Sequence, residues 1–150
     1  MKIRKATTKD IKGIAGLLHE YDLYEHKLDK SHKVDKMSEI ISFNRKLMKS
    51  SIVVYFVLEN DGKVEGIISG ELRTTALGKG AIFHNIFISK EFRGKGYGEK
   101  LLMTLENYFK KKGCKSIKSF VLSGNEKVLN FYKKIGYSSE KGWTISKRLK

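Results

Sequence analysis

The sequence feature that most constrains the fold is the stretch from Ala81 to Gly113, where a strand pattern runs into a glycine-rich turn and then directly into a helix pattern. The turn, residues 93–98, reads Arg-Gly-Lys-Gly-Tyr-Gly. Glycine lets a backbone approach a ligand closely, and the first N–H groups of a helix have no partner within it. A helix start also carries partial positive charge, so the pattern predicts a cradle for a phosphate-type anion.

The order of the remaining elements predicts an α+β (mixed α/β) fold in one domain spanning residues 1–150. We expect strands at 2–6, 52–58, 64–73, 81–88 and 116–122, helices at 7–21, 34–48, 96–112 and 125–135, and a closing hairpin at 137–149. The three middle strands follow one another, which favours an antiparallel meander. The expectation is therefore a single-layer, mixed but mostly antiparallel sheet of six to seven strands, flanked by about four helices.

The charge of the chain is strongly positive, at +15 from 31 Lys and Arg against 16 Asp and Glu. Such a surface attracts polyanions of many kinds. Because the lysines are spread along the whole chain, they do not indicate a particular partner. The sequence shows no basic reading helix, RNP-like aromatic run or zinc-ligand spacing, so nucleic acid is not the expected partner and no metal site is expected.

The cysteine content and the lengths of the apolar runs indicate in which cellular compartment the protein is expected. Cys114 is the only cysteine, so no disulfide can form within the chain, and a cytoplasmic protein is the expectation. No apolar run approaches the roughly 20 residues of a membrane span, so we expect no membrane partner. The sequence leaves a homodimer open.

Two familiar phosphate motifs do not fit the turn. A dinucleotide fingerprint requires G-x-G-x-x-G, but counting from Gly94 and Gly96 the third glycine position holds Glu99. A P-loop requires G-x-x-x-x-G-K-[ST], which the chain does not contain. The anion that the turn holds must therefore be sought elsewhere.

The pattern Arg93-x-x-Gly96-x-Gly98, between a strand and a helix, resembles the acetyl-CoA motif of the GNAT superfamily of N-acetyltransferases. A second stretch, Asn125 with Phe131-Tyr132 and then Gly136-Tyr137, is similar to the signature that this family carries on its last helix. Two motifs in the right order make the resemblance specific. It implies the acyl-CoA N-acyltransferase fold, acetyl-CoA as cofactor and acetyl transfer to an amine.

The resemblance also implies which residues hold the cofactor. The backbone of six consecutive residues would wrap the CoA pyrophosphate: Arg93, Gly94, Lys95, Gly96, Tyr97 and Gly98. The strand end formed by Ile86, Phe87 and Ile88 would splay from the strand ending at Leu122 and pair with the pantetheine arm. Asn125 would contact the cofactor or cap its helix.

Transfer of an acetyl group to an amine requires a proton acceptor for the amine and a proton donor for the departing thiolate. Tyr132 matches the position where the family commonly places a tyrosine acid; its alternative interpretation is a core aromatic on an apolar helix face. Many relatives carry a carboxylate where this chain reads Phe83-His84-Asn85-Ile86. His84 could replace it, because imidazole exchanges protons near neutral pH; a structural histidine is the alternative.

The acceptor is expected beside an acidic and aromatic segment, residues 20–29, which reads as a connection after the first helix. Its side chains could attract a cationic amine by charge and by cation–π contacts, with a carboxylate on a neighbouring strand: Tyr21, Asp22, Tyr24, Glu25 and Glu71. A polyamine or other small amine is therefore the expected substrate. A protein or peptide acetyltransferase and an acetyl-CoA sensor without turnover stay open as alternatives.

Overall fold

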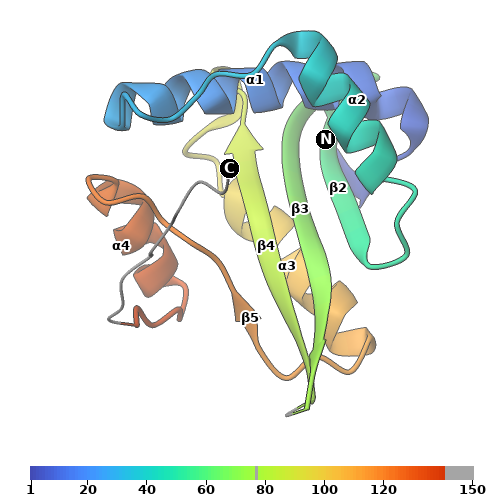
Figure 1. Ribbon diagram of the computed structural model, residues 1–150, viewed down its shortest axis with the longest axis vertical. Helices are drawn as coiled ribbons and strands as arrows, with labels where there is room; N and C mark the ends of the chain where they lie inside the picture. Colours follow the sequence, from blue (N-terminus) through green and yellow to red (C-terminus); the bar gives the residue numbers. More distant parts are fainter. Residues whose placement is uncertain (77, 141–150) are drawn as a thin grey trace, which may run out of the picture. The chain divides into compact units, whose positions relative to one another are not determined.

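A computed structural model of the chain describes residues 1–76 and 78–140 (Figure 1). The chain divides into two compact units, Met1–Phe120 and a second that begins at Val121. The first contains strands β1 (Lys2–Lys5), β2 (Val53–Asn60), β3 (Lys63–Thr75), β4 (Gly78–Ile88) and β5 (Ile117–Lys118), helices α1 (Ile11–Leu28), α2 (Met37–Leu47) and α3 (Tyr97–Lys111), and short 3-10 helices at Thr8–Asp10 and Lys90–Phe92. The second contains α4 (Glu126–Lys134). No helix in the described part of the chain is both long and apolar enough to cross a membrane.

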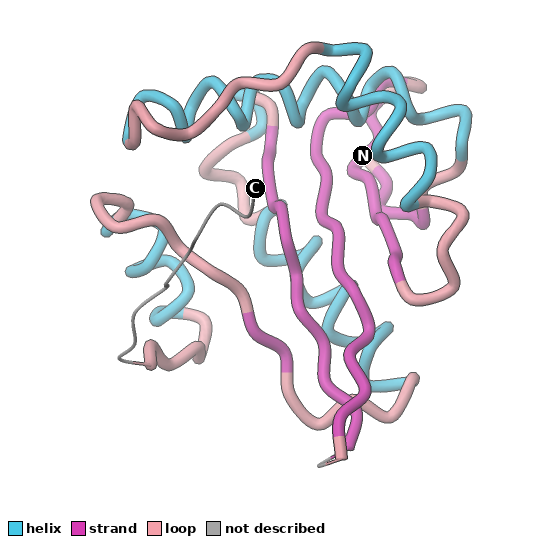
Figure 2. The backbone as a smooth tube through the Cα atoms, in the orientation of Figure 1, coloured by secondary structure: helices cyan, strands magenta, loops and turns pink. Residues whose placement is uncertain are grey.

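The strands of the first unit form one sheet in the order β1-β2-β3-β4-β5. The first four are antiparallel neighbours, and β5 runs parallel to β4. The mixed, mostly antiparallel α+β fold and the meander are thus confirmed. In Figure 2, β5 is a short segment beside the long β4, because it pairs only at Ala81 and Ile82.

The number of strands is lower than expected, since the sheet formed by residues 1–76 and 78–140 has five strands rather than six to seven. The missing strands are those of the hairpin predicted at 137–149. Residues 137–140 adopt no regular secondary structure, and residues 141–149 lie outside the described part of the chain.

The sheet of the first unit is covered by α1 and α2 on one face and by α3 on the other (Figure 1). On the first face, apolar side chains of both helices, among them Ile14 and Ile40, pack against side chains of β2 and β3 such as Ile67. On the other face α3 comes so close that a Cβ at Gly70 would lie 2.7 Å from Phe109 Cε2. Burying both sheet faces in this way removes apolar surface from water, which is the main stabilising term of the fold.

The acidic segment 20–29 is helical instead of a connection, which corrects the sequence interpretation. α1 continues through it to Leu28. The many charged residues of this segment favour a loop. However, its apolar and aromatic side chains continue the helical spacing of three to four residues: Leu17, Tyr21, Tyr24 and Leu28. The acidic side chains therefore project from a rigid element.

A β-bulge interrupts the pairing of β3 with β4. The register shifts by one residue between Ile68 and Gly70, so that Ser69 lies opposite both His84 and Asn85. A bulge bends the strand and changes the direction of its side chains. It falls at the segment where the sequence predicts a catalytic base.

The start of α1 is fixed by a buried carboxylate. Arg4 donates two hydrogen bonds of 2.8 Å to the Asp10 carboxylate, and the Thr7 amide donates a third of 2.7 Å, as expected for a capping box. The Arg4 guanidinium and the Thr7 bonds outweigh desolvation and lower the pKa of Asp10 to about 2.

We expect Asp10→Asn to lower the free energy of unfolding at pH 7 by about 1–2 kcal/mol, because the Arg4 guanidinium loses the carboxylate that it pairs with at the start of the helix. Since the pKa of Asp10 is depressed in the folded state, its contribution exists above pH 4 and is lost as the pH falls toward 2. Urea unfolding at several pH values measures both effects. Asp35→Asn, which removes an exposed ion pair with Lys33, should change stability by less than about 0.5 kcal/mol. Equal losses in the two variants would contradict this interpretation.

Candidate active site

The glycine turn has the backbone that the sequence predicts for an anion cradle. Gly94 and Gly96 adopt positive φ angles of 74° and 77°, which side chains other than glycine rarely tolerate. Gly96 is the N-cap of α3 and provides no side-chain cap, so no side chain shields the first N–H groups of the helix. A Cβ placed at either glycine would meet nothing within 4 Å. The open turn therefore fits a pyrophosphate.

The pairing of β4 with β5 ends before the residues predicted to pair with the pantetheine arm. Among the described residues, β5 pairs with β4 at Ala81 and Ile82, and just beyond β5 the Ser119 hydroxyl donates a 2.8 Å hydrogen bond to the Phe83 carbonyl. Within the described part of the chain, Ile86–Ile88 have a strand neighbour only in β3. Their other edge pairs with no described strand, which is the arrangement that pairing with a ligand would require.

Phe87 connects the turn to α1. The Arg93 guanidinium lies 4.7 Å from the centre of the Phe87 ring and donates a 2.7 Å hydrogen bond to the Ile88 carbonyl. On α1, the Tyr21 ring meets Phe87 edge-on at 6.0 Å between centres. The predicted cofactor turn and the predicted acceptor helix therefore share a contact residue.

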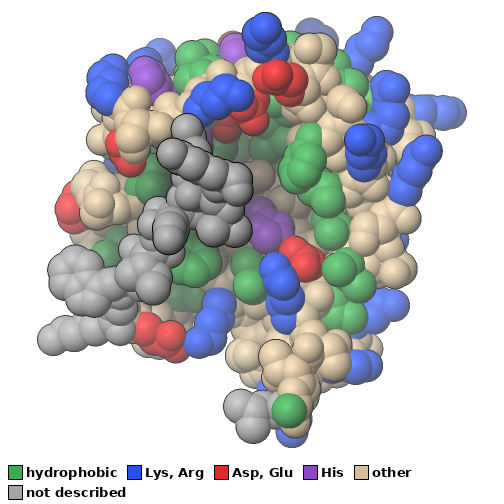
Figure 3. All heavy atoms as spheres, viewed as in Figure 1, with side chains coloured by type: hydrophobic (Ala, Val, Ile, Leu, Met, Phe, Trp, Pro, Cys, Tyr) green, Lys and Arg blue, Asp and Glu red, His purple; other side chains and the backbone are tan. Residues whose placement is uncertain are grey.

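His84 and Glu71, assigned to different roles in the sequence analysis, contact each other. His84 Nε2 lies 3.2 Å from Glu71 Oε2. Arg73 reaches the same carboxylate, with its Nε 3.2 Å from Oε1. His84 keeps 39% of its side chain exposed and Glu71 18%. On the face shown in Figure 3, histidine and acidic side chains are exposed over β3 and β4.

The acidic side chains of α1 surround a histidine from the loop that follows. The His32 ring lies 3.6 Å from Asp22 Oδ1 and 3.7 Å from Glu25 Oε2. Glu25 also accepts a hydrogen bond from the Tyr21 hydroxyl, and Tyr24 is 37% exposed. Of the predicted acceptor residues, Tyr21, Asp22 and Glu25 thus form one cluster on α1, whereas Glu71 belongs to the group around His84.

The second unit carries the remaining predicted residues. Asn125 is the N-cap of α4, but its side chain makes no capping hydrogen bond to the helix. Tyr132 is buried, with its ring packed between those of Phe131 and Tyr137. This burial raises the pKa of the Tyr132 phenol above its ordinary value. The phenol therefore stays protonated at neutral pH.

A comparison with models of protein families identifies the family to which these motifs belong. The model of the acetyltransferase (GNAT) family matches residues 17–137, which is most of the chain and includes both motifs. The chain belongs to the GNAT family.

A curated relative of this GNAT chain is an uncharacterized N-acetyltransferase of Methanocaldococcus jannaschii, which is 31% identical over 103 residues. The match covers 65% of the chain and 46% of the relative, so the chain spans about half the length of that protein.

Solved structures share the fold over nearly the whole chain. An aminoglycoside 6′-N-acetyltransferase from Acinetobacter haemolyticus has a TM-score of 0.80 and 17% identity, covering 100% of both chains. The aminoglycoside N-acetyltransferase AAC(6′)-Iy, solved in complex with CoA, has a TM-score of 0.80 and 15% identity, covering 98% of this chain and 93% of that one. At these identities the likeness shows the fold alone.

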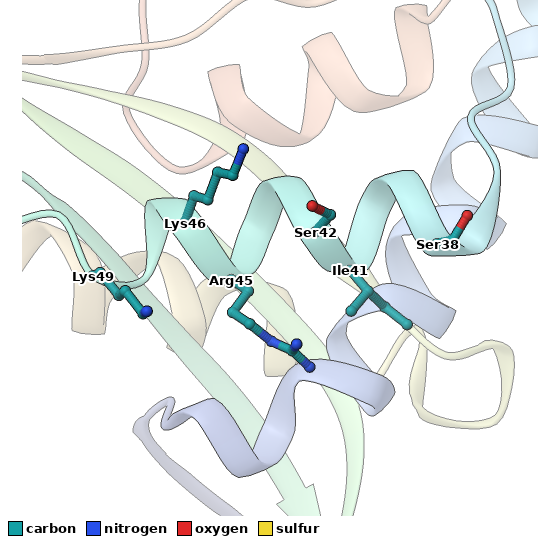
Figure 4. Close-up of a pocket in the computed structure, with 6 residues that line it drawn as sticks. All are labelled: Ser38, Ile41, Ser42, Arg45, Lys46 and Lys49. Carbon is teal, nitrogen blue, oxygen red and sulfur yellow. The ribbon is translucent and has the colours of Figure 1, made fainter.

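A hollow of about 490 Å³ on α2 lies outside the predicted site of the GNAT chain (Figure 4). Basic and hydroxyl side chains surround it, together with one apolar residue: Ser38, Ile41, Ser42, Arg45, Lys46 and Lys49. Because its charged side chains are all cationic, it repels the cationic amine expected as acceptor. None of the residues predicted for catalysis or binding lines this hollow.

Sequence reasoning missed Arg73 and His32, which hold the carboxylates of the candidate site. Arg73 lies two residues after Glu71 on the same strand, so strand alternation places both on one face and was a usable signal. His32 reaches α1 through the turn of the chain between α1 and α2, and nothing in the local sequence indicates that contact. The described residues also contain no group of three or more His, Cys, Asp or Glu arranged to hold a metal ion.

Proposed function

We propose that this chain is an acetyl-CoA-dependent N-acetyltransferase that transfers the acetyl group directly to the primary amine of a small cationic molecule. The observation that carries the proposal is the left-handed glycine turn at the uncapped start of α3, in a chain of the GNAT family. Its free N–H groups, helix dipole and open surroundings suit a diphosphate.

Acetyl-CoA would supply the acetyl group as a thioester. The backbone of residues 93–98 would hold its pyrophosphate, with the cations of Lys95 and Lys100 close by, each over an aromatic ring of the same segment. The edge of β4 at Ile86–Ile88 that no described strand covers would pair with the pantetheine arm, and Asn125 would add a contact to the cofactor.

Two side chains would move protons. His84 would accept the proton that the attacking ammonium group must lose, directly or through one water molecule. Tyr132 would donate its phenolic proton to the departing sulfur, and the raised pKa of the phenol keeps that proton available at neutral pH. A separate nucleophile is not required, because the amine attacks the thioester directly.

The acceptor would be drawn by the acidic cluster on α1. Asp22 and Glu25 are the charges and Tyr21 and Tyr24 the aromatic faces of a site for an ammonium group. Since the chain as a whole is strongly basic, this local reversal of charge favours cationic substrates. Structures of similar fold include aminoglycoside acetyltransferases, whose substrates are small polycationic amines. A polyamine is the more specific form of the proposal.

An amine panel with thiol release as the readout tests this function. Spermidine, aminoglycosides, amino acids and peptides with a free N-terminus are each incubated with acetyl-CoA, with an amine-free reaction as control. We expect release above the control with spermidine or an aminoglycoside and none with peptides. Release with peptides alone would favour peptide acetylation, and measurable CoA binding without release would favour a sensor.

A further inference from the structure

Glu71 has contacts that suit a partner of the base better than a ligand of the substrate. Its carboxylate lies 3.2 Å from His84 Nε2 and is held from the other side by Arg73, through Nε at 3.2 Å and a 3.4 Å hydrogen bond from an Nη group. Glu71 is the least exposed of the three side chains, at 18%. Because the positive charge of Arg73 already offsets the charge of this carboxylate, Glu71 is poorly placed to be the main contact of a cationic amine.

The bulge in β4 places His84 and Phe87 on the same face of the sheet. On a regular strand His84 and Phe87, three residues apart, would point to opposite faces. Phe83 faces α3, because it lies opposite Gly70, whose Cβ would touch Phe109. His84 therefore points to the other face, where Phe87 packs against the core below α1. Because two residues of β4 lie opposite Ser69, His84 and Phe87 both point to the face of the sheet that also carries Glu71.

We propose that Glu71 is a positioning residue for His84: it fixes the imidazole in the Nε2–H tautomer, which leaves Nδ1 as the atom that accepts the proton of the amine. A carboxylate only accepts hydrogen bonds, so the neutral ring must place its hydrogen on Nε2 to bond to Glu71. This inference rests on the proposed function, because it specifies the base of that reaction.

The proton step balances without a further reactant. The acceptor ammonium group loses one proton to His84 Nδ1, the ring becomes imidazolium, and the neutral amine keeps its lone pair for attack on the thioester. Glu71 stays ionised throughout and stabilises the new positive charge across the Nε2–H bond. Arg73 weakens that stabilisation, because its own positive charge engages the same carboxylate.

The two partners should therefore act in opposite directions on the pH–rate profile. Glu71 contacts the ring directly, and Arg73 is the charged group that acts through it. Glu71→Gln removes the negative charge, so the ring loses its proton more readily and the acidic limb moves to lower pH. Arg73→Gln removes the positive charge, so that limb moves to higher pH. General disruption of the site would not produce shifts of opposite sign.

We expect Glu71→Gln to lower kcat about 10-fold with little change in the KM of the amine, because a glutamine amide both accepts and donates and no longer selects one tautomer. In a His84→Ala background the same substitution should have no further effect. Glu59→Gln is the matched control, a strand glutamate paired with Arg4, and should leave kcat and the pH profile unchanged.

A raised KM in Glu71→Gln that persists without His84 would overturn the proposal and return Glu71 to substrate binding. A readout independent of turnover separates this outcome from failure of the proposed function. Nitrogen NMR of the ligand-free protein should show the hydrogen of the neutral His84 ring on Nε2, and a mixture of both tautomers in Glu71→Gln. If no amine in the panel causes thiol release, the proposed acetyl transfer is wrong. The tautomer measurement still tests the role of Glu71 in that case.

Discussion

Replacing Gly96 by alanine is expected to raise the Kd for acetyl-CoA about 10- to 100-fold. Gly96 is left-handed, at φ 77°, and precedes the first turn of α3. Alanine in that conformation costs about 1–2 kcal/mol, so the backbone relaxes and the N–H groups turn away from the pyrophosphate. Losing one hydrogen bond to a charged group costs about 1.5–3 kcal/mol, which gives the expected range. Calorimetric titration with acetyl-CoA measures it.

Gly62→Ala is a control matched in both conformation and surroundings. Gly62 sits in the hairpin between β2 and β3, has the same φ of 77°, and like Gly96 has nothing within 4 Å of a built Cβ. Both variants carry the same backbone strain, so both should lose about 1 kcal/mol of stability. Only Gly96→Ala should lose affinity. If the two variants bind acetyl-CoA equally well, the turn does not hold the cofactor.

The sequence predicts the fold well where a local rule decides the structure. The turn at Asp61 and Gly62 has positive φ angles at both residues, as the Asn-Asp-Gly stretch predicts, and the helices end near glycines with positive φ at 113 and 136. The segment 20–29 was misread, because charge alone does not end a helix whose apolar residues continue at helical spacing.

The candidate site is predictable to a smaller degree, because its main contacts join residues far apart in the sequence. The glycine turn is local, so its left-handed backbone can be read from the residue types. The pairing of Glu71 with His84 depends on the register of β3 against β4, which sets Glu71 opposite Ile82, two residues from His84. No composition or spacing rule gives that register, so the sequence does not indicate the partner of His84.

Tyr132→Phe is expected to lower kcat about 100-fold and to leave the Kd for acetyl-CoA nearly unchanged. The substitution removes only the hydroxyl, so the departing sulfur loses its proton donor, and general-acid effects begin at about that size. The ring remains packed against Phe131 and Tyr137. Steady-state kinetics at saturating acetyl-CoA, together with calorimetric titration, separate the two effects.

Tyr108→Phe is the control for this change, since it removes a hydroxyl from a half-buried tyrosine near the end of α3, far from the glycine turn along the helix. Its kcat should match that of the unmodified chain. Because burial raises the pKa of Tyr132, the donor stays protonated beyond pH 10, the ordinary value for tyrosine. The rate of the unmodified protein should therefore show no fall from loss of this proton between pH 8 and 10. Unchanged turnover in Tyr132→Phe would remove the phenol from the mechanism and leave it as a packed aromatic of α4.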